Sequence, residues 1–341
     1  MFIAPTQIRY VYEEPPNEAI RLHLNECLYN VPDFVVEAVT KYLKSCNLYP
    51  NKSLFDRLRE LLAEYTKTNK DNVYPFVGGD GALRSIFYNL VNQGNKVLYI
   101  DPTFAMIKVY AEARGLVSVT VNSYEDGDWW RVDTDALIEK SRNVNLAVIV
   151  DPNNPTGGPV VHAKENVVEA LAKNVNGYVV FDEAYHEYAG YTVVPYIDRY
   201  PNIIVVRSLS KAFCLAGFRL GYIVADKNVI ERISAIHTTF DIPTPSLVAG
   251  ISALENRWHM EKVVNNIKEI RNYLYEKFKT LNLKVYRSLT NFLLIRDKRD
   301  LSSILRKHGI YIKKVGEDLY RLTIPPPELC SKILYVIGRE L

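Results

Sequence analysis

Short apolar segments alternate with helical segments between about residues 72 and 226, and this alternation constrains the fold more than any other feature of the chain. The apolar segments are rich in β-branched side chains and too short for buried helices, so they predict strands. Strands that alternate with helices pair in parallel and are covered on both faces. We therefore predict an α/β fold with a mostly parallel sheet between helices. The expected strands are residues 96–100, 117–121, 146–150, 178–181, 203–206 and 220–224.

The C-terminal part of the chain predicts a second, smaller α+β domain. A helical pattern with a bend reaches about residue 281, and it is long enough to bridge two domains. Four further strands and two helices follow it. The proline-rich start predicts an irregular arm. The expected division is an arm over 1–21, a large domain over 45–240, and a small domain formed by 22–44 and 241–341.

The charge pattern favours small-molecule partners. The chain carries 42 Lys and Arg against 39 Asp and Glu, and these charges are scattered. A basic stripe for nucleic acid or a polybasic membrane patch is therefore not expected. The start of the chain does not resemble a secretion signal, and no apolar run approaches the length of a membrane span, so we expect a cytoplasmic protein.

The four cysteines, Cys27, Cys46, Cys214 and Cys330, lie far apart in the sequence, without CxxC spacing or nearby histidine pairs. This spacing favours reduced thiols over a disulfide framework or a zinc site. No metal is implied.

Lys211 is the first candidate for chemistry. It lies in a loop with Ser208 and Ser210, directly after the expected strand 203–206. In open α/β sheets, ligands bind at the carboxyl ends of strands. Desolvation or a nearby cation, such as Arg219, can bring a lysine pKa down to about 7, where the amine forms imines. A lone lysine, however, is most often a solvated surface residue.

Two neighbouring strand ends carry further candidates. Asp182 follows the strand before that of Lys211, Tyr185 comes three residues later, and Asn154 lies in the loop of the preceding strand. Each has an ordinary interpretation, as a helix cap, half-buried packing and a turn residue respectively. Together they would place a carboxylate, a phenol and an amide at one edge of the sheet.

A glycine-rich segment, residues 76–82, precedes an amphipathic helix and includes Gly79 and Asp80. Backbone N–H groups of such a loop can turn toward an anion at the helix N-terminus. The segment is neither a Walker loop nor a complete G-x-G-x-x-G motif, so it predicts a phosphate site without predicting a nucleotide.

These groups together suit pyridoxal phosphate. Lys211 can react with its aldehyde, Asp182 can hold its ring nitrogen protonated, and Asn154 and Tyr185 can bind its ring oxygen. A protonated ring withdraws electrons from the substrate Cα, and the displaced lysine can move the proton.

Three motifs in this order resemble the class I/II aminotransferases, which are pyridoxal-phosphate enzymes of fold type I. They are 153–157 (Asn-Asn-Pro-Thr-Gly), 181–185 (Phe-Asp-Glu-Ala-Tyr) and the segment 208–221 around Lys211. The resemblance spans about residues 22–324 and is closest to the histidinol-phosphate aminotransferases, to whose opening motif 25–32 is partly similar. It implies a large domain with a mostly parallel seven-stranded sheet and a smaller α+β domain.

The resemblance also implies residue roles. Lys211 would form the imine, Asp182 would bind the ring nitrogen, and Tyr185 and Asn154 the ring hydroxyl. The cofactor phosphate would be bound by Gly79, Asp80, Ser208, Ser210, Arg219 and, across a homodimer interface, Tyr49. Phe104 would stack on the ring. Substrate would be bound by Tyr29, Asn154, Lys313 and Arg321, with Arg321 holding the α-carboxylate. Lys313 stands where the family usually has an arginine for the substrate phosphate.

The implied reaction exchanges an amino group between histidinol phosphate and 2-oxoglutarate in histidine biosynthesis. Aromatic amino-acid aminotransferases share every cofactor residue, so they remain an alternative. Threonine-phosphate decarboxylases are another, although 22–25 does not supply their typical His-Gly-Gly segment. A cofactor-binding regulator would need a DNA-binding domain, for which the chain has no room before the arm ends.

Overall fold

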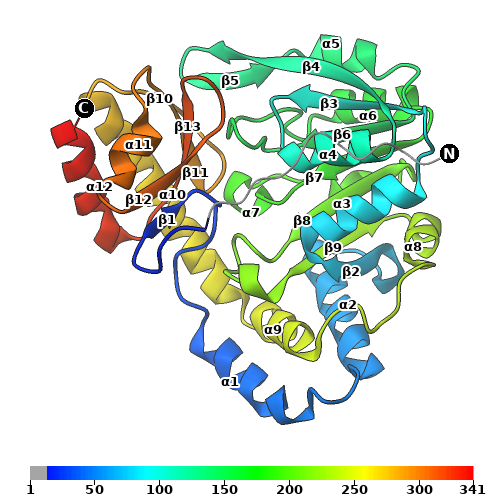
Figure 1. The fold of residues 1–341 in the computed structure, drawn as a ribbon. Helices are drawn as coiled ribbons and strands as arrows, with labels where there is room; N and C mark the ends of the chain where they lie inside the picture. Colours follow the sequence, from blue (N-terminus) through cyan, green and yellow to red (C-terminus); the bar gives the residue numbers. More distant parts are fainter. Residues whose placement is uncertain (1–13, 341) are drawn as a thin grey trace.

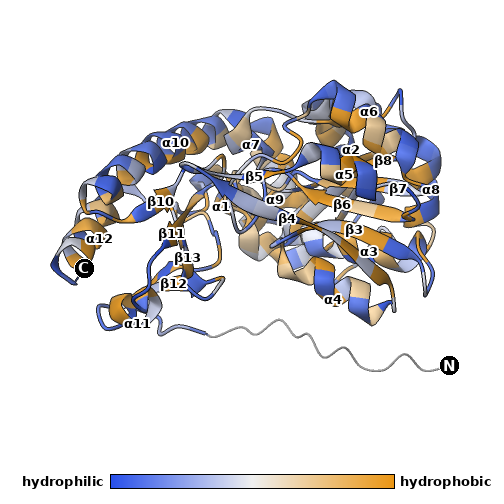
Figure 2. Ribbon diagram, turned by 90° about the horizontal axis from the view of Figure 1, so that it is seen from above, coloured by the Kyte–Doolittle hydropathy of each residue, from blue (hydrophilic) through white to orange (hydrophobic). Residues whose placement is uncertain are grey.

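The computed structural model describes residues 14–340, and its largest feature is an eight-stranded sheet with helices on both faces (Figures 1 and 2). In spatial order its strands are β2 (Val73–Val77), β9 (Leu220–Ala225), β8 (Ile203–Ser208), β7 (Tyr178–Asp182), β6 (Leu146–Val150), β3 (Lys96–Asp101), β4 (Val117–Asp126) and β5 (Trp129–Val132).

The strand directions confirm a mostly parallel sheet. Strands β3, β4, β6, β7 and β8 run parallel, whereas β9 is antiparallel to both of its neighbours. The six strands expected from the sequence are all present. The resemblance implied seven strands, and the sheet has an eighth because β4 continues past the expected residue 121 and turns back into β5 as a hairpin.

The helices associated with this sheet connect its strands or pack on its β2–β9 side. They are α2 (Lys52–Thr66), α3 (Gly78–Asn89), α4 (Ala105–Ala113), α5 (Thr134–Lys140), α6 (Glu165–Asn174), α7 (His186–Ala189), α8 (Lys227–Ser234) and α9 (Thr244–Glu255). Short 3₁₀ turns occupy Leu43–Ser45, Lys70–Asn72, Val194–Tyr196 and Ala216–Phe218.

A second sheet of five strands forms the smaller α+β part (Figure 1, left). Its spatial order is β1 (Ile20–Leu22), β12 (Ile310–Lys314), β13 (Leu319–Thr323), β11 (Phe292–Arg296) and β10 (Lys284–Tyr286). The helices that accompany it are α10 (Arg257–Thr280), α11 (Leu301–Arg306) and α12 (Pro327–Glu340), whereas α1 (Asp33–Tyr42) packs on α9. The expected bend in the long helical segment is Asn256, which separates α9 from α10.

The start of the chain contributes to the small sheet. Strand β1 pairs in parallel with β12, Ile20 opposite Ile310. The arm was expected to end at residue 21, so its last two residues belong to a paired strand. Residues 1–13 of the arm lie outside the described residues.

The central strands of the large sheet are apolar on both faces. Every residue of β6, β8 and β9 is buried, as expected for strands covered by helices on both sides. Within residues 14–340, no helix is both long and apolar enough to cross a membrane. The same residues contain no group of three or more His, Cys, Asp or Glu side chains arranged to hold a metal ion.

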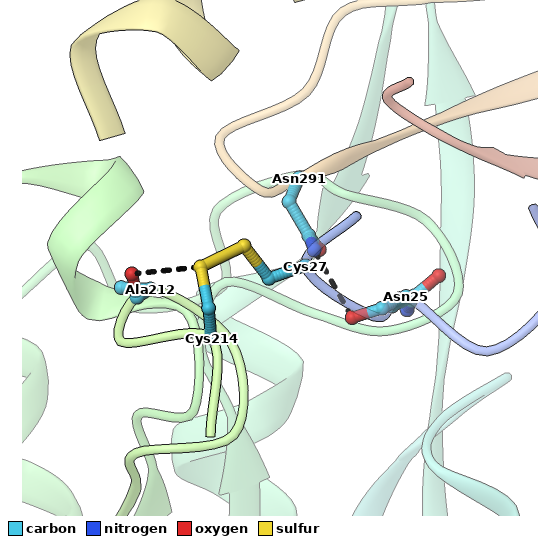
Figure 3. The surroundings of a disulfide bond; sticks show 5 residues. All are labelled: Asn25, Cys27, Ala212, Cys214 and Asn291. Carbon is cyan, nitrogen blue, oxygen red and sulfur yellow. Dashed lines mark hydrogen bonds between the residues drawn. A yellow bond between two sulfur atoms is a disulfide. The ribbon is translucent and has the colours of Figure 1, made fainter. Parts of the chain in front are cut away.

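Cys27 and Cys214 form a disulfide, which the cysteine spacing did not predict (Figure 3). The expectation of four reduced thiols is wrong for this pair, and Cys46 and Cys330 are free. The two bonded cysteines are 187 residues apart in sequence. The prediction failed because it rested on local spacing, whereas the fold brings the segment after β1 against the loop after β8.

Candidate active site

A cleft of about 770 Å³ opens at the carboxyl ends of the parallel strands. The last residues of β3, β6, β7 and β8 all line it, and residues from β12, β13 and the segment after β1 complete it. The cleft therefore lies between the two sheets. Of the predicted site residues, it gathers Gly79, Asp80, Phe104, Asn154, Asp182, Tyr185, Ser208, Ser210, Lys211, Arg219, Lys313 and Arg321.

Lys211 lies inside this cleft, and its amine is within reach of one acceptor. Its Nζ donates to the carbonyl oxygen of Leu24 at 3.2 Å. Burial, followed by the charge of Arg321, lowers the pKa of Lys211 to about 8. Arg219, the cation expected from the sequence, also lowers this pKa but contributes less than Arg321. A substantial neutral fraction near physiological pH makes this amine a competent nucleophile and base.

Asp182 ends β7 and is almost fully buried at the base of the cleft. Its Oδ1 accepts a hydrogen bond from the backbone N–H of Ala184 at 3.1 Å. Burial raises the pKa of Asp182 to about 7, although this hydrogen bond and the charge of Lys211 act in the opposite direction. A cationic partner in the cleft would strongly stabilise the ionised form of such a buried carboxyl.

An anion cradle forms where α3 begins beside the end of β8. Gly79 and Asp80 lie in the first turn of α3, and Arg219 approaches Asp80 at 3.5 Å. A Cβ on Gly78 would lie 2.7 Å from Nη2 of Arg219, so the glycine leaves room for the guanidinium. Ser208 and Ser210 line the same cleft. Helix N–H groups, two hydroxyls and a guanidinium form a donor set suited to a phosphate.

The phenol of Tyr185 is held in place from two sides. Its hydroxyl accepts a hydrogen bond from Nδ2 of Asn25 at 2.9 Å, and its ring meets Phe292 edge-on with centroids 5.4 Å apart. Burial raises the pKa of Tyr185 to about 12, so the phenol remains a hydrogen-bond donor throughout the physiological range.

Arg321 reaches across the cleft from the small sheet. Its Nη1 donates to Oδ1 of Asn154 at 2.5 Å, and its Nη2 donates to the carbonyl oxygen of His23 at 2.7 Å. Its guanidinium also lies over the Phe292 ring, 5.5 Å from the centroid. Arg321 and Asn154, both of which the resemblance assigns to substrate binding, therefore contact each other across the cleft.

Lys313 lies directly opposite Arg321 in the antiparallel pair β12–β13. Opposed residues in such a pair project from the same face of the sheet. Both line the cleft, together with Lys314. The small sheet thus presents several cations to the cleft, which favours substrates with negatively charged groups. Phe104 also lines the cleft, at the start of α4.

Two predicted residues are not in the cleft of this chain. Tyr49 is exposed, with 79% of its surface accessible, and its ring packs on Phe240 at a centroid distance of 4.9 Å. Tyr29 is half-buried against the hydrophobic core, and burial raises its pKa. Neither is brought to Lys211 within one chain.

Sequence reasoning missed the contribution of residues 23–27, although residues 25–27 belong to the segment 25–32 that is partly similar to a family motif. His23, Leu24 and Asn25 contact Arg321, Lys211 and Tyr185 respectively. Two of these contacts use backbone carbonyls, which no residue pattern reveals. The amide of Asn25 was the available signal, because it lies in the segment similar to the family's opening motif.

The donor set fits pyridoxal phosphate. The cleft supplies an amine for the aldehyde, a buried carboxyl for the ring nitrogen, a phenol and an amide for the ring oxygen, and the anion cradle for the phosphate. An aromatic side chain, Phe104, is available for stacking.

The fold is that of the fold type I aminotransferases. The structure is similar to the histidinol-phosphate aminotransferase of Sinorhizobium meliloti solved in complex with pyridoxal-5'-phosphate, with a TM-score of 0.84, 24% identity, and coverage of 94% of this chain and 91% of that one. It is also similar to the aspartate aminotransferase of Thermus thermophilus with maleate, with a TM-score of 0.80, 24% identity, and coverage of 95% and 92%.

A family model described as aminotransferase class I and II matches residues 17–335. The chain therefore belongs to the class I and II aminotransferases. Among curated relatives, the histidinol-phosphate aminotransferase of Sulfurisphaera tokodaii is 46% identical over 94% of this chain and 90% of its own length. The histidinol-phosphate aminotransferase of Thermoanaerobacter pseudethanolicus is 34% identical over 82% of this chain and 78% of its own length.

Proposed function

We propose that this chain is a pyridoxal-phosphate-dependent histidinol-phosphate aminotransferase, which converts histidinol phosphate and 2-oxoglutarate to imidazole acetol phosphate and glutamate in histidine biosynthesis. The observation that carries the reaction class is the pairing of Lys211 and Asp182, with opposite pKa shifts, at neighbouring strand ends in one cleft. The choice of substrate is supported by the 46% identical relative of that name.

The residues of the cleft divide the work of such a reaction. Bound pyridoxal phosphate supplies a carbonyl that takes up amino groups and a ring that withdraws electrons from the substrate Cα. Asp182 holds the proton of the ring nitrogen and is itself stabilised as a carboxylate by that charge. Lys211 would hold the cofactor aldehyde, and its free amine would take the proton from the substrate Cα.

Substrate binding falls to the cations of the small sheet. The planar fork of Arg321, aligned by Asn154 and His23, matches the α-carboxylate of glutamate or 2-oxoglutarate. Lys313, opposite Arg321 in the sheet, provides a point charge for the phosphate of histidinol phosphate. One cleft can then take both substrates in turn, as a ping-pong exchange requires.

A homodimer with a shared site is part of the proposal. Tyr49 is far more exposed than a core tyrosine. Leu48, its neighbour in the sequence, and Phe240, on which the Tyr49 ring packs, are exposed as well. Exposed apolar side chains that gather in this way are typical of interfaces. We assign Tyr49 to the cofactor phosphate of the second subunit and Tyr29 to substrate binding. A biosynthetic enzyme of this kind acts in the cytoplasm.

The half-reaction separates this proposal from its alternatives. The yellow cofactor-loaded protein is mixed with histidinol phosphate, phenylalanine or threonine phosphate, and the loss of visible absorption is followed. Fastest conversion is expected with histidinol phosphate. Preference for phenylalanine would indicate an aromatic aminotransferase, and carbon dioxide release from threonine phosphate a decarboxylase.

A further inference from the structure

Residues 23–27, which we call the strap, contact three side chains of the cleft at once. The carbonyl oxygens of His23 and Leu24 accept hydrogen bonds from Arg321 at 2.7 Å and Lys211 at 3.2 Å. Asn25 donates to the hydroxyl of Tyr185 at 2.9 Å. The strap therefore touches the groups proposed for the substrate carboxylate, the cofactor aldehyde and the cofactor ring oxygen.

The strap is attached to the small sheet by the backbone of Asn25. Its N–H donates to Oγ1 of Thr323 at 3.0 Å. Its carbonyl oxygen accepts from Nδ2 of Asn291 at 3.0 Å, a bond that Figure 3 shows. Asn25 adopts a left-handed conformation, with φ at 54°, which turns the chain at this point. These bonds fix the strap to the small sheet but not to the loop of Lys211.

The disulfide supplies that second attachment. Cys27 ends the strap, and Cys214 lies three residues after Lys211 in the loop beyond β8. The strap's hydrogen bonds to Arg321, Lys211 and Tyr185 can each be exchanged for hydrogen bonds to water at small net cost. A covalent bond cannot be exchanged in this way, so it confines the strap beside the lysine loop.

We propose that the Cys27–Cys214 disulfide is a positioning element of the active site, and that its opening by a dithiol releases the strap from the loop of Lys211 and weakens substrate binding. This inference rests on the proposed function for the roles of Lys211 and Arg321. Cys27 is half-buried and Cys214 is buried, so a reductant is directed to the sulfur of Cys27.

The redox step is thiol–disulfide exchange. A thiolate of the dithiol attacks Sγ of Cys27, the Cys27–Cys214 bond breaks, and Cys214 leaves as a thiolate that takes a proton. The second thiol of the dithiol then displaces Cys27, which is protonated in turn. The dithiol is oxidised to its cyclic disulfide, and the two cysteines gain two electrons and two protons in total.

A thiol count tests the bond itself. The chain has four cysteines, and the structure leaves Cys46 and Cys330 free. Holoenzyme purified without reductant, then denatured and treated with iodoacetamide, should gain two labels, and four after dithiothreitol. Four labels without dithiothreitol in protein handled under air would overturn the proposal, and this result is independent of any catalytic activity.

Kinetics test the positioning role. Dithiothreitol should raise the KM for glutamate about tenfold, because the loop of Lys211 is then no longer held against the strap and against Arg321 of the small sheet, and it should change kcat much less. Without dithiothreitol, the variants Cys27→Ser and Cys214→Ser should already show the raised KM of the reduced wild-type enzyme. Adding dithiothreitol should not change their KM further. Cys46→Ser, at an exposed free cysteine, should behave as the wild type. A lower Tm with an unchanged KM would mean a purely structural bond and would overturn the positioning role.

Hydrogen–deuterium exchange separates this inference from the proposed function. Amides of the strap should exchange faster in the reduced wild-type holoenzyme than in the oxidised one, whichever substrate the enzyme uses. Unchanged exchange on full reduction would refute the strap's release, while failure of histidinol phosphate as substrate would refute only the proposed function.

Discussion

Arg321 of β13 and Asn154 of the loop after β6 are joined by a hydrogen bond of 2.5 Å, although 167 residues separate them in the sequence. This contact ties the small sheet to the carboxyl edge of the large one directly beside Lys211. A carboxylate that binds Arg321 is thereby placed at the same cleft edge as the lysine, which is the geometric requirement for moving a proton from the adjacent Cα.

Replacing Arg321 and Lys313 in turn should affect different substrates. Arg321→Lys keeps the charge but removes the fork, so we expect the KM for glutamate to rise about tenfold or more. Lys313→Ala should raise the KM for histidinol phosphate and leave that for glutamate within about twofold, since it removes one charge of the phosphate site. Steady-state kinetics with each substrate provide the comparison. If both variants weakened both substrates equally, the phosphate role of Lys313 would be refuted.

The pKa of Lys211 predicts how cofactor uptake depends on pH. Only the neutral amine reacts with an aldehyde, and the pKa of Lys211 lies near 8 rather than at its ordinary 10.5. The rate at which apoenzyme acquires visible absorption should therefore rise with pH with a midpoint near 8. Arg321→Gln removes a cation that lowers this pKa, so the midpoint should move upward. A midpoint that stays fixed would show that the charge of Arg321 does not act on Lys211.

Asp182 should make the apoenzyme less stable at alkaline pH. Burial raises its pKa from 3.8 to about 7, so the folded state binds a proton more tightly than the unfolded state. The resulting stabilisation is complete below about pH 4 and is lost as the pH rises through about 7. At pH 8, Asp182→Asn should stabilise the apoenzyme by roughly 1–4 kcal/mol and weaken cofactor binding. Thermal unfolding of the apo and loaded forms measures both effects, and a destabilised apo variant at pH 8 would contradict the assignment.

Gly221 should tolerate no side chain. An added Cβ would lie 2.4 Å from the backbone of Gly78 and Gly79, so Gly221→Ala must displace the start of α3. We expect a loss of about 1–3 kcal/mol in unfolding free energy and weaker binding of the cofactor phosphate. Gly217→Ala is the matched control, because its Cβ meets nothing within 4 Å and its stability should be unchanged. Equal stability of the two variants would contradict the close approach.

The sequence predicted the strand ends and their side chains well for a physical reason. Buried parallel strands appear in the sequence as apolar runs, and a polar residue that directly follows such a run, such as Asp182, lies at the ligand-binding edge of the sheet. Tertiary contacts that no local sequence pattern marks could not be predicted in the same way. The carbonyl groups of His23 and Leu24, and the Cys27–Cys214 bond, depend on how the two sheets meet rather than on any local pattern.

The identity of the lysine that carries the cofactor tests the account most directly. Four lysines line the cleft, namely Lys108, Lys211, Lys313 and Lys314. Holoenzyme is reduced with borohydride, digested, and the modified peptide is sequenced by mass spectrometry. We expect the cofactor mass on Lys211. In Lys211→Ala, both the modified peptide and the visible absorption should be absent. Attachment to any other lysine, or a purified protein that takes up no cofactor, would contradict the site described here.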